Sequence, residues 1–424
     1  MITAVKGFKD VLPHEVPLWR FCEEKAREIF SRYGYQEMRL PIVEHTELFV
    51  RSLGDASDIV EKEMYTFLDK GGDSLSLRPE ATASMARAYL EHAMDLNHPT
   101  GKLFTFGPMF RRERPQAGRL RQFHQLDVEA FGVASPALDA EVLVMLNHFA
   151  REMGIGSMVT LELNSLGCSQ CRPAFRSALV GFLTEVSGDL CPDCQRRMGT
   201  NPLRVLDCKR EGCRRVVREA PSIQDSLCHQ CKEYQEKLFE LLDVSGVSFL
   251  LNPLLVRGLD YYTRTVFELT TDRLGAQNAV AAGGRYDSLL KEIGNKDIPG
   301  IGFAVGMERL VLLLQQVDVE VGTVPPLLFV APLDEGEALK VGFALAGYLR
   351  EKGVAVEVSH QKRSLKANLR KANRMGCRWV AMIGENELSK GTVLLRDMET
   401  KEQTEVPWDG GLGVYSIIVE EEES

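Results

Sequence analysis

Apolar residues recur along the first hundred positions with two different spacings, which predict helices and strands in alternation. From residue 13 to residue 33 they recur every three or four positions, as expected for one face of a helix. The following segment, YGYQEMRLPIVEHTELF, predicts a strand that ends near Pro41. A second helix is expected to begin at Pro79 and Glu80, because apolar residues from 85 to 94 share one face and a carboxylate stabilises a first turn.

A strict alternation of side chains then predicts a hairpin with a basic tip. LFTFGPMF and RQFHQLDVEAF are the expected antiparallel strands, and the polar loop ERPQAGR joins them. The second strand is expected to have a polar face and a mainly apolar face, formed respectively by Gln125, Asp127, Glu129 and by His124, Leu126, Val128, Ala130. Arg111 ends the first strand, so its guanidinium is expected to overhang the polar face. The alternative is an amphipathic hairpin whose polar face is simply solvated.

Two later segments combine arginine with strand-forming residues. LLVRGLDYYTRTVFELTT predicts a strand preceded by a turn, and this turn contains Arg257, Asp260, Tyr261 and Tyr262. AAGGRYDSLL follows, and GIGFAVGMERLVLLL predicts a strand that breaks into a helix with Arg309 in its first turns. The glycines of the last segment are spaced GxGxxxG, and the chain contains no GxxxxGK[ST]. Any bound phosphate is therefore expected to be held by arginine forks rather than by a glycine-rich loop.

The last hundred residues predict a separate small α/β domain. LLFVAPL, VAVEV, WVAMIG and TVLLRD are expected strands, whereas ALKVGFALAGYLREKG and SLKANLRKANRMG are expected helices. Strands that alternate with helices predict a largely parallel sheet. The chain ends in EEEES, which is expected to form a disordered tail.

Charge is distributed unevenly over this domain. The formal net charge of the chain is −9, yet the nineteen residues from 360 to 378 contain no acidic residue. They contain seven basic residues: Lys362, Arg363, Lys366, Arg370, Lys371, Arg374 and Arg378. A solvated helix face is the alternative, but a basic run without counter-charge favours binding of a polyanion.

Composition limits the class of protein. With 424 residues, of which 44% are apolar, the chain is long enough for two or three cores. No apolar run approaches the length of a membrane span, and the N-terminal segment MITAVKGFKDVLPHEV lacks the apolar stretch of an export signal. We therefore expect a cytoplasmic protein with reduced cysteines and no membrane partner.

Eight of the ten cysteines lie between residues 166 and 254, in four close pairs. These pairs are Cys168 with Cys171, Cys191 with Cys194, Cys208 with Cys213, and Cys228 with Cys231. Three pairs are CxxC and one is CxxxxC, spacings that are typical of tetrahedral thiolate Zn²⁺ sites and sufficient for one or two of them. The alternative, reduced cysteines that simply fill helix ends and turns, stays open.

The motifs together resemble those of one enzyme family. FRRERPQAGRLRQFHQLDVE resembles motif 2 of class II aminoacyl-tRNA synthetases, GIGFAVGMERL resembles motif 3, and the segment through Pro41 resembles the weaker motif 1. LVRGLDYYTRTVFE and GGRYD resemble the two signatures of histidyl-tRNA synthetases. The resemblance implies an α+β fold with an antiparallel-sheet catalytic domain (1–165 and 255–322), a helical, cysteine-rich insertion (166–254) and an α/β anticodon-binding domain (325–424).

The resemblance also implies a reaction and its residues. In this family the histidine carboxylate attacks the α-phosphorus of ATP, magnesium pyrophosphate leaves, and the activated histidine passes to the 3′-hydroxyl of tRNA(His). Arg111 and Arg257 would be catalytic, the former on the α-phosphate and the latter between carboxylate and phosphate. Arg309 would contact adenine or the γ-phosphate, and Glu113 would hold adenine or Mg²⁺. Such a site works by positioning and electrostatics.

Recognition of histidine would need a second set of residues. By the same resemblance the α-amino group and the imidazole would be bound by Glu80, Thr82, Gln125, Glu129, Arg257, Tyr261 and Tyr262. Of these, Glu129 and Tyr262 would contact the two ring nitrogens, so that an analogue without them would leave buried polar groups unpaired. Each has a structural alternative: Glu80 as a first-turn charge, Tyr262 as part of the core, and Glu129 as a solvated strand residue.

The expected macromolecular partners are tRNA(His) and a second copy of the chain, with no DNA. The tRNA contacts would come from the hairpin tip and the basic run, through Arg114, Gln116, Lys362, Arg363, Lys366 and Arg370. One alternative function is a histidine-sensing regulatory relative without catalysis, but such relatives tend to lack the ATP arginines and the anticodon domain. Another is a zinc-dependent RNA-binding protein, which leaves the hairpin and LVRGLDYY without a purpose.

Overall fold

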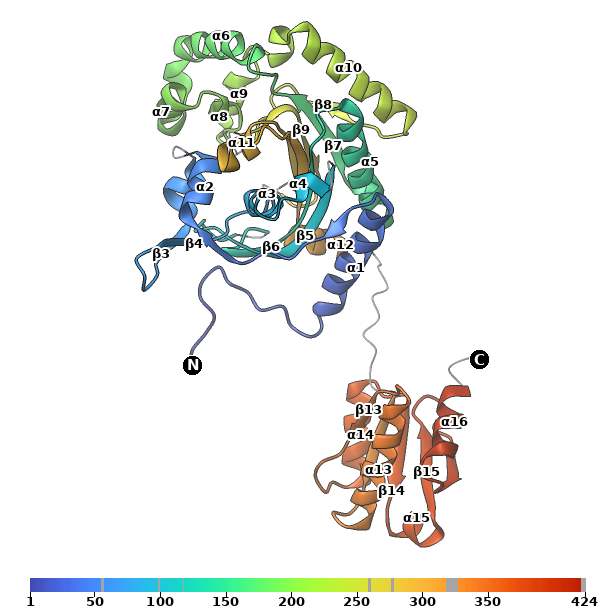
Figure 1. Cartoon of the computed structure of the whole chain (residues 1–424). Coiled ribbons are helices and arrows are strands. Elements are labelled where there is room, and N and C mark those ends of the chain that lie inside the picture. The colour runs from blue at the N-terminus through green and yellow to red at the C-terminus, as the bar shows by residue number, and fades with distance from the viewer. Residues whose placement is uncertain are drawn as a thin grey trace. The chain divides into compact units, whose positions relative to one another are not determined.

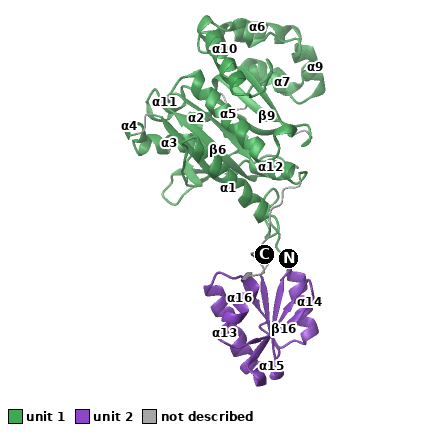
Figure 2. Cartoon of the chain, turned by 90° about the vertical axis from the view of Figure 1, so that its right-hand side faces the viewer, with its two compact units in different colours: residues 1–321 green, residues 322–424 purple. Residues whose placement is uncertain are grey.

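The chain folds as two units, residues 1–321 and residues 322–424 (Figure 2). The computed structural model describes residues 1–54, 57–97, 100–116, 118–257, 261–275, 278–317 and 327–420. The first unit contains the hairpin, the arginine-bearing segments and the cysteines in pairs, and the second contains the basic run. No described helix is long and apolar enough to cross a bilayer.

An eight-stranded sheet organises the first unit, in the order β1-β5-β6-β11-β10-β9-β7-β8 (Figure 1). Its strands are β1 (Gln36–Glu37), β5 (Gly101–Phe110), β6 (Gln122–Phe131), β7 (Thr160–Ser165), β8 (Leu250–Leu251), β9 (Thr263–Thr270), β10 (Ala279–Tyr286) and β11 (Gly300–Gly306). The inner pairs are antiparallel, and only the edge pairs β1–β5 and β7–β8 are parallel. The α+β fold with an antiparallel sheet is therefore confirmed.

The predicted hairpin is confirmed by the pairing of β5 with β6, which runs from Gly101 opposite Phe131 to Phe110 opposite Gln122. Its alternation is confirmed as well. Leu126, Val128 and Ala130 are fully buried in a core, and the polar face of the same strand lines a cavity. The sheet thus has one apolar face that packs and one polar face that is available for binding.

Helices cover the apolar face of the sheet (Figure 1). They are α1 (Val16–Arg32), α5 (Pro136–Glu152) and α12 (Met307–Leu314). Their apolar stripes join the strands in one hydrophobic core. The predicted first helix and the strand-to-helix break before Arg309 are confirmed, because apolar residues at helical spacing bury one face of each helix.

A smaller layer packs around the other face and contains α2 (Thr46–Leu53), α3 (Thr82–Glu91), α4 (Met94–Asn97) and α11 (Leu289–Gly294). Beside it lie a three-stranded sheet of β2 (Val43–His45), β4 (Ser74–Leu77) and β3 (Tyr65–Leu68), and the π-helix Ile59–Glu63. The 3₁₀ turn Gly156–Met158 instead follows α5 and contacts it. α2, α3 and α11 contact one another. This layer brings the N-terminal end of α3 to the polar face of β6.

Two predictions in this region are wrong. The strand expected to end near Pro41 is only β1, because the pairing with β5 ends after Met38 and Pro41 has no amide to continue it; β2 and α2 follow. The second helix begins at Thr82, not at Pro79 and Glu80, and the Glu80 carboxylate instead accepts a hydrogen bond from the Ala83 amide at 2.9 Å. It ends at Glu91 rather than continuing to 94, as Ala93 has a φ of 48°.

The segment between β7 and β8 is helical, as expected. It contains α6 (Cys171–Glu185), α7 (Pro192–Thr200), α8 (Leu203–Leu206), α9 (Glu211–Val217) and α10 (His229–Val244), with 3₁₀ turns at Ser187–Asp189 and Ile223–Ser226. α10 packs along α5 (Figure 1). The other helices gather around the paired cysteines and continue the core beneath the cavity.

The second unit is a five-stranded sheet in the order β13-β12-β14-β15-β16, flanked by helices. The elements are β12 (Leu328–Pro332), α13 (Glu337–Glu351), β13 (Val356–Val358), α14 (Leu365–Met375), β14 (Trp379–Ile383), α15 (Glu385–Lys390), β15 (Thr392–Asp397), β16 (Gln403–Pro407) and α16 (Leu412–Glu420). The predicted α/β domain is confirmed, with β13, β12 and β14 parallel. α15, β16 and α16 were not predicted, and the tail EEEES lies outside the described residues except Glu420.

Candidate active site

The polar face of β6 is the floor of a cavity of about 640 Å³ in the first unit. The predicted catalytic, histidine-binding and ATP-binding residues all line it: Glu80, Thr82, Arg111, Glu113, Gln125, Glu129, Arg257, Tyr261, Tyr262 and Arg309. They come from five separate segments of the chain. Asp260 and the rest of residues 258–260, part of the signature LVRGLDYY, lie outside the described residues.

Three guanidinium groups converge on this cavity. Arg111 lies over the Phe123 ring and donates from Nε to the Pro79 carbonyl at 2.8 Å. Arg257 is ion-paired with Glu268 and lies over the Tyr262 ring. A backbone carbonyl fixes Arg111 without neutralising its charge, so that this charge remains available to an anion, whereas the Glu268 carboxylate orients Arg257.

The third guanidinium, Arg309, is anchored through backbone carbonyls. Its Nη1 donates to Ala279 at 2.6 Å and its Nε donates to Gly118 at 3.1 Å. Burial lowers the pKa of Arg309, and the nearby charges of Arg119 and Arg111 lower it further. A pKa lowered by neighbouring cations indicates a local excess of positive charge, which a polyanionic ligand would relieve.

Carboxyl groups line the same cavity. Burial raises the pKa of Asp127 well above its usual range, and the Glu80 carboxylate raises it further. Burial also raises the pKa of Glu129, although its carboxylate accepts hydrogen bonds from the hydroxyls of Thr82 and Tyr286. Among the described residues, Glu80 Oε2, Asp127 Oδ2 and Gln125 Oε1 are buried without a hydrogen-bond partner. Such oxygens fit a cationic donor such as an ammonium group.

Two residues of this floor were missed by sequence reasoning. Asp127 shares the predicted polar face of β6, so the alternation itself was the signal that could have identified it. Tyr286 belongs to the quoted signature GGRYD, and its hydroxyl donates to Glu129. Arg285 of the same signature is structural instead, since it forms a fully buried ion pair with Asp139.

Some predicted residues lie away from the cavity or have another partner. Arg114 and Gln116 are exposed on the hairpin tip and do not line the cavity. Glu113 is ion-paired with Arg119. The basic residues Arg197, Arg204, Lys209 and Arg210 of the helical segment border the cavity; no local pattern signalled them, because only the tertiary fold brings that segment to β6.

The paired cysteines form two groups of four. The first cluster is Cys168, Cys171, Cys228 and Cys231, and the second cluster is Cys191, Cys194, Cys208 and Cys213. In each, the sulfur atoms lie within 4.8 Å of one another, and no cysteine is in a disulfide. In the first cluster, Cys168 Sγ is 3.7 Å from Cys171 Sγ and 3.8 Å from Cys228 Sγ. Four sulfurs at about 2.3 Å from a central Zn²⁺ would be separated by about 3.8 Å.

Backbone amides stabilise negative charge in both clusters. The amides of Cys228 and Cys191 each donate to a cluster sulfur at 3.2 Å, on Cys171 and Cys213 respectively. The amide of Cys194 lowers the pKa of the Cys191 thiol to about 7. The four sulfur atoms of each cluster lie close together, and four thiolates at this spacing are stable only when a cation lies between them. The clusters thus fit a metal ion.

Glycine at position 302 is needed for the carboxylate floor. Gly302 of β11 lies opposite Glu129 in the sheet register. A Cβ added there would lie 1.8 Å from Glu129 Oε2 and 2.3 Å from the Val128 carbonyl oxygen. The backbone oxygen cannot move away without breaking the strand pairing, so only glycine lets Glu129 turn into the cavity.

The antiparallel sheet, the arginines of the motif 2 hairpin and the motif 3 helix together define the chain as a class II aminoacyl-tRNA synthetase. The model of the family "Histidyl-tRNA synthetase" matches residues 7–170 and 201–310, and that of "Anticodon binding domain" matches residues 328–414. The chain belongs to the histidyl-tRNA synthetase family.

Relatives in this family match the chain over nearly its whole length. The chain is 51% identical to a histidine–tRNA ligase of Desulfatibacillum aliphaticivorans, with 97% of each chain covered. It is also 51% identical to the corresponding ligase of Geobacter sulfurreducens, with 96% of this chain and 97% of that one covered. The crystal structure of apo S. aureus histidyl-tRNA synthetase superimposes with a TM-score of 0.80 at 34% identity, covering 99% of both chains.

Substitution of Gly302 tests the packing of the floor. Gly302→Ala is expected to lower the free energy of unfolding by about 1–3 kcal/mol, because the methyl group overpacks against the Val128 carbonyl and Glu129. The matched control is Gly181→Ala in α6, where nothing lies within 4 Å of the added Cβ. This control should raise stability by up to about 1 kcal/mol through helix propensity. Urea unfolding measures both, and equal effects would contradict the steric argument.

Proposed function

We propose that the chain ligates L-histidine to tRNA(His) through a histidyl-adenylate, with release of pyrophosphate and then AMP. The observation that carries this proposal is a single cavity lined both by guanidinium groups and by unpaired buried oxygens. The guanidinium groups suit a triphosphate and a carboxylate, and the oxygens suit an amine. Membership of the family supports the same assignment.

On the nucleotide side, Arg111 holds the α-phosphate and Arg257 lies between this phosphate and the histidine carboxylate. Two anions that repel each other are thereby brought together, and the charge that develops at the phosphorus is stabilised. Arg309 contacts the adenine or the γ-phosphate. Mg²⁺ supplies counter-charge to the leaving pyrophosphate. Glu113, because of its ion pair with Arg119, orients the hairpin loop in addition to its proposed contact with adenine or Mg²⁺.

On the amino-acid side, Glu80 and Gln125 bind the α-amino group through oxygens that have no other partner. We add Asp127 to this set for the same reason. Thr82 acts partly through Glu129, to which its hydroxyl donates at 2.5 Å. Glu129 and Tyr262 contact the two imidazole nitrogens, and Tyr261 and Arg257 complete the histidine-binding set. An N–H group of the neutral or protonated imidazole ring can donate a hydrogen bond to a carboxylate, which makes Glu129 the main determinant of specificity.

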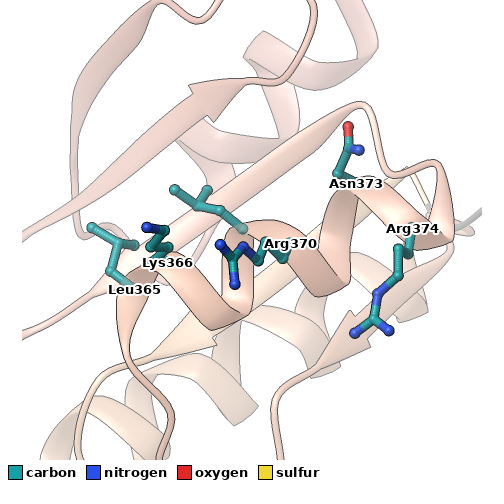
Figure 3. A pocket seen from close by; sticks show the side chains of 6 residues that line it. Leu365, Lys366, Arg370, Asn373 and Arg374 are labelled. Carbon is teal, nitrogen blue, oxygen red and sulfur yellow. The ribbon is translucent and has the colours of Figure 1, made fainter.

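On the tRNA side, the exposed Arg114 and Gln116 meet the acceptor end, and α14 of the second unit meets the anticodon region. The outward-facing Lys366 and Arg370 project from α14 beside a surface hollow (Figure 3). Among the described residues, no carboxylate forms an ion pair with Lys362, Arg363, Lys366 or Arg370, whereas Lys371 is paired with Glu357. Unpaired cations on one helix suit a phosphate backbone.

The domain limits and the assembly are proposed with the function. We assign residues 1–165 and 255–322 to catalysis, 166–254 to the insertion and 325–424 to anticodon binding. A homodimer that pairs through motif 1 is supported by exposed apolar residues just after this motif and in the same small sheet, which are Ile42 before β2, Val43 in β2, and Phe67 and Leu68 in β3. The site of action is the cytoplasm. Each thiolate cluster holds one structural Zn²⁺, which braces the insertion.

Histidine-dependent exchange of pyrophosphate into ATP, followed by charging of tRNA(His), tests the proposed activity. The protein is expected to perform both with histidine and neither with other amino acids. A regulatory relative would bind histidine without exchange, and a zinc-dependent RNA-binding protein would bind tRNA without exchange. Absence of exchange with intact, folded protein would overturn the proposal.

Substitution of Arg257 separates catalysis from binding. Arg257→Ala is expected to lower the rate of adenylate formation by about 100- to 1,000-fold, since its charge acts mainly in the transition state. Histidine affinity, measured by calorimetry without ATP, should fall much less. Arg114→Ala, an exposed arginine outside the cavity, is the matched control and should leave both values unchanged. Equal losses of rate and affinity would remove Arg257 from the catalytic role.

Metal analysis tests the Zn²⁺ sites. Purified protein is expected to contain two zinc ions per chain, one for each cluster of four thiolates. Thiol modification should release them in parallel with loss of the eight cluster thiols. Cys22→Ala, which alters a buried cysteine outside the clusters, should leave the zinc content unchanged. Alkylation of all eight thiols without any release of metal would end the assignment.

A further inference from the structure

Each thiolate cluster fixes the start of a helix that carries an arginine directed at the cavity wall. Cys171 is the first residue of α6, and the next residue is Arg172. Cys191 and Cys194 lie at the start of α7, and Arg197 follows Cys194 by three residues. A ligand that holds the sulfurs therefore also holds the first turn from which each arginine extends.

The first cluster is connected to the amino-acid side of the cavity. Arg172 donates from Nη2 to the backbone carbonyl of Tyr262, the tyrosine proposed to contact imidazole. The connecting segment is tied to the sheet as well, because the Arg264 amide donates to Gly167 O at 3.0 Å. Gly167 has a φ of 63°, and a Cβ there would lie 2.6 Å from Cys171 Cβ. The turn is thus shaped to place Cys171 against the strand that follows Tyr262.

The second cluster is connected to the nucleotide side. Arg197 Nη2 lies 3.0 Å from Asp58 Oδ2, and both side chains are about one-third exposed. Asp58 precedes the π-helix Ile59–Glu63. At the end of that helix, the Glu63 carbonyl accepts a hydrogen bond from the Arg112 amide at 2.6 Å. The chain of contacts therefore ends beside Arg111, the residue proposed to hold the α-phosphate.

We propose that the two clusters position the two substrate subsites separately: the first holds the histidine side through Arg172, and the second holds the ATP side through Arg197 and Asp58. The inference rests on the proposed function for the identity of the two ligands. In this proposal both arginines are positioning residues: Arg172 acts through the Tyr262 backbone, and Arg197, which borders the cavity, acts through Asp58. Metal loading of the two clusters consequently has distinguishable effects on the two substrates.

Matched substitutions test the separation. Arg172→Gln is expected to weaken histidine binding about tenfold and to change ATP-analogue binding less than twofold, because the charged hydrogen bond to the Tyr262 carbonyl is lost on the histidine side. Arg197→Gln is expected to have the reverse pattern. Calorimetric binding of histidine and of a non-hydrolysable ATP analogue to the full-length, zinc-loaded protein measures both. The zinc content of each variant should equal that of the unmodified protein.

A double-mutant cycle and a cysteine variant that removes one metal site complete the test. Asp58→Asn should weaken binding of the ATP analogue as much as Arg197→Gln does, and the double variant should bind it no more weakly than either single variant. The exchanged pair, Arg197→Asp with Asp58→Arg, should restore part of the affinity for the analogue. Cys194→Ser should lose one zinc ion and weaken binding of the analogue, with little added effect in the Arg197→Gln background. Similar losses for both ligands in both arginine variants, or no loss in either, would overturn the inference.

Failure of the proposed function is distinguishable from failure of this inference. If the unmodified protein binds histidine and the ATP analogue but performs no exchange, the proposed ligase activity is wrong. The binding measurements on the variants then still decide whether the two arginines position the subsites. If it exchanges normally while Arg172→Gln and Arg197→Gln alter neither affinity, the activity stands and the coupling is wrong. If the unmodified protein binds neither ligand, both proposals fail.

Discussion

Like charges held together inside a cavity are the constraint on which the rest of the site depends. Burial lowers the pKa of Arg309, and the charges of Arg119 and Arg111 lower it further. Burial raises the pKa of Asp127, and the Glu80 carboxylate raises it further. Each charge is disfavoured because burial removes the water that would screen it. A ligand that carries an anionic and a cationic group offsets both repulsions, so the cavity is suited to such ligands.

Buried charges at fixed positions require a rigid frame, which the sheet supplies. Antiparallel pairing fixes β6, β11 and β10 side by side, so that Gly302 can leave room for Glu129 and Tyr286 can donate to its carboxylate. The fully buried pair of Arg285 and Asp139 ties β10 to α5 behind the floor. A buried ion pair adds little net stability but costs much when one partner is lost, so it fixes the register of these elements.

The insertion adds a different kind of rigidity. Its short helices α7, α8 and α9 lie between the longer α6 and α10, and their apolar side chains belong to one core. Two groups of four cysteines lie at the starts of α6, α7 and α10, in a segment whose arginines reach the cavity wall. A metal ion held by such a group would cross-link these helix starts without adding bulk near the cavity.

The sequence by itself determined whatever depends on local periodicity: the hairpin with its polar face, the strand-to-helix break before Arg309 and the α/β order of the second unit. It also supplied the motif residues, although not how they meet. Tertiary structure alone decided that Tyr286 donates to Glu129, that Arg285 is structural, and which cysteine pairs combine into clusters. The early strand and helix limits failed where pairing partners and a carboxylate contact overrode propensity. Period and propensity act between neighbours in the chain, whereas clusters and ion pairs join residues separated by as many as 201 positions in the chain.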